Sequence, residues 1–164
     1  MSMTSGFTAA LAIVLIAIGL ALPVQAGDRI PVREGWAVHQ TQMTYEEMLG
    51  RMKPAISAEK MGLVTQAGPT GVAKKRGITI PGSRVFGVFN NKFAVRAIRT
   101  SISAMIEAPI RMYVTENPDG TATLSYKTPS HVFAPYFDEG GAELRQIAAE
   151  LDAIFARIAK GVTG

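Results

Sequence analysis

The stretch "IRMYVTENPDGTATLSYK", residues 110–127, decides the fold more than any other part of the chain. Its centre, "NPDG", fits a type I turn with proline at the second position and glycine at the end. Alternating residues flank the turn on both sides, which predicts an antiparallel hairpin in which Asn117 pairs with Thr121. In this register one face carries four apolar side chains: Met112, Val114, Leu124 and Tyr126.

The opposite face of the predicted hairpin is polar. It carries Arg111, Tyr113, Thr115, Thr123, Ser125 and Lys127. Arg111 and Lys127 are directly opposed, and like charges in this position are mildly destabilising. An anionic ligand or an acidic partner would relieve the repulsion; the alternative is that both long side chains extend into water. We expect no helix of the same chain to cover this face.

Three more strands and three helices are expected around the hairpin. The strands are predicted at 35–42, 63–68 and 83–89, and the helices at 44–62, 92–108 and 142–160. Thr44 and Glu47 have the spacing of a capping box, and Pro54 predicts a kink in the first helix. The last helix has apolar residues at i, i+3, i+4 and i+7, so we expect Leu151 and Phe155 in the core.

Three further details of the fold follow from the pattern. In the first strand, alternation places Trp36 and Val38 on one face, taken to be the apolar one, and His39 on the polar face. Residues 69–82 are expected to form a glycine-rich basic loop, and 129–137 an irregular aromatic segment. In the middle helix the expected buried stripe is Ala94, Ala97, Ile98, Ser101, Ile102, Met105 and Ile106.

The resulting order is β-α-β-β-α-β-β-α. We therefore expect an α+β fold of two layers, an antiparallel-rich sheet with helices packed on one face. Residues 27–164 form a single domain in this interpretation, because we find no repeat and no internal linker.

The first 26 residues are predicted to be a signal peptide. An apolar run ends in Val24-Gln25-Ala26, a pattern typical of cleavage after Ala26. We therefore expect a periplasmic or secreted protein with no membrane contact after cleavage. No Lys or Arg precedes the run, which approaches the length of about 20 residues that spans a bilayer, so an uncleaved anchor is the alternative.

The composition excludes several classes of site. The chain contains no cysteine, which rules out disulfides, thiolate metal sites, iron–sulfur clusters and covalently attached haem. The net charge is +4, and the one basic cluster is "AKKR" at 73–76. In an exported protein we interpret this cluster as a solvated loop and expect no nucleic-acid partner.

The segments "VFGVFNN" (85–91) and "APIRMYVTENPDGTATLSYKTPS" (108–130) resemble the bacterial family known as domain of unknown function 302. The resemblance covers about 36–160. It implies a compact α+β domain that tends to form dimers, and it implies no established activity and no catalytic residues. Many members have an acidic residue before the proline, whereas this chain has Lys127-Thr128-Pro129.

Candidate chemistry is sparse, and we do not expect an enzyme. Outside the predicted signal peptide there are two histidines, His39 and His131, and no GxSxG elbow. His39, Met43 and His131 could ligate copper(I), because imidazole and thioether groups suit that ion. His131 lies in an aromatic setting that could flank a noncovalent haem. Packing roles explain the same residues, so no cofactor is predicted.

Two readings of function remain from the sequence. The first is a noncatalytic module that binds a small anionic ligand or an acidic partner surface and forms a homodimer. Its candidate ligand-binding residues are His39, Arg111, Tyr113, Ser125 and Lys127. The alternative is a periplasmic copper or haem protein that uses His39 or His131, and an enzyme of unknown reaction comes third. The sequence defines neither ligand nor pathway.

Overall fold

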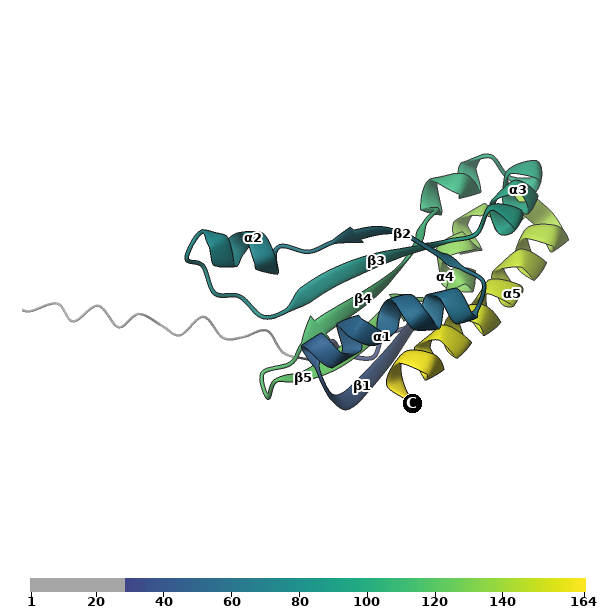
Figure 1. Cartoon of the computed structure of the whole chain (residues 1–164). Coiled ribbons are helices and arrows are strands. Elements are labelled where there is room, and N and C mark those ends of the chain that lie inside the picture. The colour runs from purple at the N-terminus through teal and green to yellow at the C-terminus, as the bar shows by residue number, and fades with distance from the viewer. Residues whose placement is uncertain (1–28) are drawn as a thin grey trace, which may run out of the picture.

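The computed structural model describes residues 29–164, so the predicted signal peptide lies outside the described residues. Within them, five antiparallel strands form one sheet in the order β1-β5-β4-β3-β2 (Figure 1). The strands are β1 (Trp36–Thr44), β2 (Gly62–Ala67), β3 (Ser83–Phe89), β4 (Ile110–Glu116) and β5 (Thr121–Lys127). The predicted α+β fold is confirmed.

The helices fall into two long ones and several short ones. They are α1 (Tyr45–Ala58), α2 (Thr70–Lys75), α3 (Asn91–Thr100), the 3-10 helix η1 (Ser103–Glu107), α4 (Pro129–Phe133), the 3-10 helix η2 (Ala134–Tyr136) and α5 (Phe137–Thr163). The helices α1 and α5 pack on one face of the sheet, which we call the helix-covered face; the other is the open face. No helix in residues 29–164 combines the length and apolarity needed to cross a membrane.

The central hairpin has the predicted register. Met112 pairs with Tyr126 and Val114 with Leu124, all four side chains being buried on the helix-covered face. At the turn, the Asn117 N–H donates to the Thr121 carbonyl at 2.7 Å. Because alternation and turn chemistry agree here, the hairpin fixes which side of the sheet the helices must cover.

The core lies between the sheet and the two long helices. Thr44 and Glu47 form the predicted capping box of α1, and the helix continues through Pro54 without dividing. Along α5 the apolar stripe is buried as expected: Leu151 is 4% exposed and Phe155 is fully buried.

The middle helix differs from the prediction. It ends at Thr100, because Ser101 takes an extended conformation and its Oγ accepts from the Ala104 N–H, which starts η1. A serine that bonds to nearby backbone competes with helical hydrogen bonds in this way. Ala97 is buried, but the expected burial of Ile98, Ile102 and Ile106 is wrong, since all three are exposed.

Three short segments were also predicted as less regular than they are. Residues 70–75 of the basic loop form α2, and the aromatic segment forms α4 and η2. The last helix, α5, has a break at Gly141, whose φ is 60°; its long part begins after this break, as predicted, and a further short helical segment, 137–140, precedes the break.

The face assignment of β1 was wrong. Trp36 pairs with Lys127 and Val38 with Ser125, so Trp36 and Val38 lie on the open face, while His39 pairs with Leu124 and lies on the helix-covered face. The physical reason is that β1 is an edge strand: residues 36–39 are all half-buried, so hydrophobicity does not separate its two faces.

Candidate functional site

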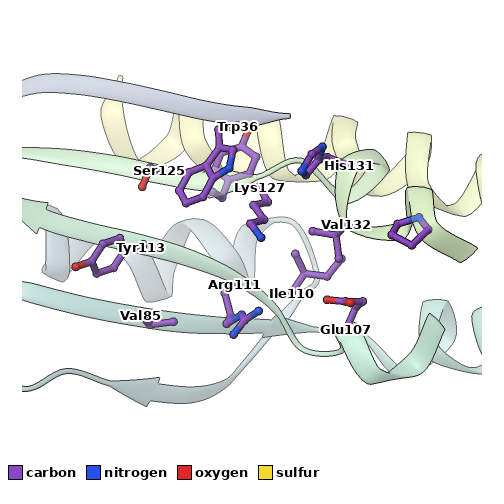
Figure 2. A pocket seen from close by; sticks show the side chains of 12 residues that line it. Trp36, Val85, Glu107, Ile110, Arg111, Tyr113, Ser125, Lys127, His131 and Val132 are labelled. Carbon is purple, nitrogen blue, oxygen red and sulfur yellow. The ribbon is translucent and has the colours of Figure 1, made fainter. Parts of the chain in front are cut away.

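A hollow of about 380 Å³ lies on the open face, where β1, β5 and β4 approach α4 and η1 (Figure 2). This open-face hollow is lined by Trp36, Val85, Glu107, Ile110, Arg111, Tyr113, Ser125, Tyr126, Lys127, His131, Val132 and Pro135. Its volume lies within the range of roughly 300–1,000 Å³ that is usual for small-molecule sites. Four of the five predicted ligand-binding residues line it, and His39 does not.

Two cations face the hollow without an acidic partner. Arg111 and Lys127 are both exposed, and among residues 29–164 neither forms an ion pair. The Lys127 Nζ lies 5.9 Å from the centre of the Trp36 ring, and the Arg33 guanidinium lies 5.0 Å from it. The indole therefore supplies an apolar wall that two cations border, as Figure 2 shows for Lys127.

The floor of the hollow holds an unsatisfied hydroxyl. Ser125 is fully buried on β5, and its Oγ has no hydrogen-bond partner within the described part of the chain. Beside it, the Tyr113 hydroxyl is 2.9 Å from the Ser83 Oγ and is thereby satisfied. A buried hydroxyl without a partner costs stability, and because Ser125 has no exposed surface, a ligand in the hollow reaches its Oγ only when neighbouring side chains move.

One acid offsets part of the positive charge. The Glu107 carboxylate lines the hollow from η1 and accepts a hydrogen bond of 2.9 Å from the Tyr136 hydroxyl. This bond, followed by partial desolvation and the carboxylate charge, raises the pKa of Tyr136. Glu107 is thus held at the rim by a neutral donor and does not neutralise Arg111 or Lys127 by pairing.

His131 forms the wall next to the start of β1. Its imidazole packs directly on Gly35, where a Cβ atom would lie 2.0 Å from the His131 Nδ1. Gly35 also has a φ of 72°, a conformation that side chains disfavour, and its carbonyl accepts from the Thr128 N–H at 2.9 Å. The wall therefore depends on a glycine at this position.

The far end of the open face is partly covered by the chain itself. Arg29 is hydrogen-bonded to Gln40 and to Asp119 of the hairpin turn, and Ile30 borders a second, smaller hollow with Tyr113 and Thr115. The open face is thus not covered by a helix, as expected, but residues 29–30 cross it. The open-face hollow is the part that stays accessible.

The predicted metal ligands do not come together. His39 and Met43 border a shallow depression beside the end of α5, whereas His131 lines the open-face hollow on the other side of the sheet. In residues 29–164 no three His, Cys, Asp or Glu side chains are grouped to hold a metal ion. A site that uses all three predicted ligands is excluded by this geometry, and a copper or haem site at one histidine stays an untested prediction.

Comparison with known families identifies the domain. The family model "Domain of unknown function DUF302" matches residues 37–160. The chain belongs to this family. The crystal structure of an uncharacterized conserved DUF302 protein from Bacillus stearothermophilus is similar, with a TM-score of 0.66 and 18% identity, covering 79% of this chain and 97% of that one. At this identity the likeness shows the fold alone. A search of curated proteins found no match.

In this DUF302 domain, the sequence predicted the hairpin residues that line the candidate site and missed the other lining residues. Arg111, Tyr113, Ser125 and Lys127 share one hairpin, so their common face follows from local register. Trp36, Glu107 and His131 reach the hollow from three other elements, by long-range pairing that no local pattern encodes. The one feature of the local sequence that could have indicated this part of the hollow was Gly35, next to the aromatic Trp36.

His39 gives the DUF302 domain a predicted pH dependence. Its ring stacks on Tyr126 at 6.0 Å, its Nε2 is buried without a partner, and desolvation lowers its pKa. The unfolded chain therefore binds the proton more readily, so the free energy of unfolding should fall as the pH drops below about 6.5. We expect His39→Phe to flatten this slope between about pH 7.5 and 5.5 in urea denaturation, and an unchanged slope would contradict the assignment.

Proposed function

We propose that this DUF302 domain is a noncatalytic module that binds a small anion with an apolar body in the open-face hollow. The observation that carries the proposal is the pair of exposed, unpaired cations, Arg111 and Lys127, at a hollow of ligand size. The repulsion between them is relieved when an anion lies between them.

The walls indicate what kind of anion fits. Trp36, Val85, Ile110, Val132 and Pro135 give the hollow a largely apolar lining. An apolar ring or chain gains by leaving water for such a surface, whereas a bare inorganic anion does not. The ligand class proposed is therefore a small carboxylate with an aromatic or aliphatic body, with its carboxylate toward Arg111 and Lys127.

Export and self-association belong to the same proposal. Residues 1–26 support export to the periplasm or medium with cleavage after Ala26, and the family resemblance supports a homodimer. An acidic surface on a partner protein would contact the same two cations, Arg111 and Lys127, and is the alternative ligand of the open-face hollow.

The test is ligand-induced thermal stabilisation. Benzoate should raise the melting temperature of the protein more than equimolar phosphate does, because the ring adds apolar contact. Arg111→Ala combined with Lys127→Ala should weaken benzoate binding by about tenfold or more, since two charge-assisted contacts are lost. Both side chains are exposed, so the double variant should fold normally.

The matched control removes two other exposed cations from the opposite layer, Lys53→Ala on α1 and Lys160→Ala on α5. It changes the net charge equally and should leave the benzoate effect intact. If neither anion stabilises the wild-type protein, or if the two double variants lose binding equally, the hollow is a solvated surface and the proposal is wrong.

A further inference from the structure

The cations of this chain are distributed very unevenly. Between Lys60 and Ile106 there are eight Lys or Arg residues and no Asp or Glu. The whole chain has a net charge of +4, so the remaining residues sum to −4. This acid-free segment runs through β2, α2, β3 and α3 into η1.

Most of the cations of the segment are free. Arg84 lies beside Tyr45 on the helix-covered face, and Arg96 pairs with Glu143 and Glu150 of α5. The other six are exposed and, as far as the structure describes the chain, make no ion pair: Lys60, Lys74, Lys75, Arg76, Lys92 and Arg99.

The same segment also holds nearly all of the exposed large apolar side chains of the described residues. On α3 and η1, Ile102 is 76% exposed and Ile106 is 78% exposed, with Val95 and Ile98 beside them. On β2 and near α2, Val64, Val72 and Ile78 are each more than half exposed. Outside the segment, Val32 is the one further case in residues 29–164.

These features lie along one side of the molecule. The strand β2 is an edge strand, α2 follows one of its ends, and α3 starts at the other (Figure 1). There Gly62 pairs with Phe89, and the Asn90 side chain donates to the Lys60 carbonyl at 2.9 Å. Free cations and exposed valine and isoleucine side chains therefore flank β2 at both of its ends, and we call residues 60–78 and 91–106 together the β2 edge.

We propose that this β2 edge binds the surface of an anionic lipid bilayer. Basic residues near such a surface are attracted by anionic headgroups, and aliphatic side chains insert at the boundary between headgroups and acyl chains. The absence of acids from the segment removes the repulsion that an anionic surface would otherwise meet. The sequence alone led us to expect no membrane contact, because it did not reveal that Ile98, Ile102 and Ile106 are exposed.

Other occupants fit the β2 edge less well. A second copy would place six unpaired cations against six others across a two-fold interface, which is unfavourable. Single-stranded nucleic acid also attracts cations, but its bases stack on aromatic side chains, and the exposed large side chains of the segment are Val and Ile.

Hydrogen exchange of the full chain with lipid vesicles tests the proposal. Vesicles of equal parts phosphatidylglycerol and phosphatidylcholine should protect residues 62–78 and 91–106, and phosphatidylcholine vesicles should not. Residues 1–26 contain an apolar run that would bind vesicles by itself, so protection at the β2 edge is the readout. Equal protection by both vesicle types, or none by either, would overturn the proposal.

Variants separate the electrostatic from the apolar contribution; partitioning is measured as the lipid concentration at which residues 62–78 and 91–106 are half protected, because sedimentation would also report the apolar run in residues 1–26. Neutralising Lys74, Lys75 and Arg76 to Gln should lower partitioning into the mixed vesicles by between about tenfold and about one hundredfold. Ile102→Ser with Ile106→Ser should lower it by about tenfold, because two inserted side chains are lost. The control Lys53→Gln, Arg145→Gln and Lys160→Gln removes the same charge from exposed positions of α1 and α5 and should change partitioning less than about twofold.

Three results would contradict the lipid assignment. Equal losses in the test and control charge variants would mean that net charge alone attracts the chain. Protection of 62–78 and 91–106 that appears without vesicles and grows with protein concentration would assign the β2 edge to a second copy. Stronger protection by a single-stranded oligonucleotide than by the mixed vesicles would assign it to nucleic acid.

Discussion

Replacing Phe155 by alanine should lower the free energy of unfolding by about 3–5 kcal/mol, the usual cost of deleting a buried aromatic ring. Phe155 is fully buried on α5, and its ring lies 5.6 Å from that of Tyr126 on β5. The side chain thus joins the helix layer to the sheet layer, and its removal leaves a cavity that α5 cannot close without leaving the sheet. Urea denaturation monitored by circular dichroism measures the loss.

The control for this substitution is Ile106→Ala, which removes an aliphatic side chain that is 78% exposed. We expect it to change the free energy of unfolding by less than about 0.5 kcal/mol, as exposed substitutions usually do. Comparable losses in the two variants would mean that Ile106 is buried in solution, for example by self-association. A loss below about 1 kcal/mol for Phe155→Ala would place α5 outside the core.

The comparison of Phe155 with Ile106 also shows where sequence patterns predict burial. Both residues belong to apolar stripes of helical period, and the stripe of α5 is buried as predicted. Beyond Ser101 the stripe of α3 fails because periodicity describes one continuous helix, and Ser101 ends it. Ile98 lies within the unbroken helix and is exposed as well. A pattern predicts that an apolar face exists; it does not say whether the same chain supplies the surface that covers it.

The strands show the same limit of sequence patterns: alternation groups side chains by face but does not say which face is covered. Alternation correctly grouped the side chains of β4 and β5, where Met112, Val114 and Leu124 are fully buried. For the edge strand β1 it grouped the side chains correctly but put the groups on the wrong faces, with Trp36 on the open face and His39 beneath the helices. The hollow was therefore predictable where one hairpin builds it, and unpredictable where β1, η1 and α4 complete it.

Gly35→Ala is the substitution that should affect the fold and the open-face hollow together. With a φ of 72°, Gly35 adopts a conformation that costs other residues about 1–2 kcal/mol. The added methyl group would also lie 2.0 Å from the His131 Nδ1, so the imidazole must leave its place in the wall of the hollow. We expect a total loss of roughly 2–3 kcal/mol in the free energy of unfolding, together with weaker benzoate binding.

Gly77→Ala separates the two causes of this loss. Gly77 has a φ of 74°, but a Cβ atom there would meet nothing within 4 Å, so its substitution measures the backbone cost alone. The loss in the free energy of unfolding for Gly35→Ala, minus the loss for Gly77→Ala, then measures the clash with His131; we call this difference the excess. In a His131→Ala background that excess should vanish, because the methyl group replaces the missing ring, and a double-mutant cycle reports the coupling directly. If the excess persists without the imidazole, Gly35 is required by the backbone of β1 and β5, and His131 is not held in the wall by this contact.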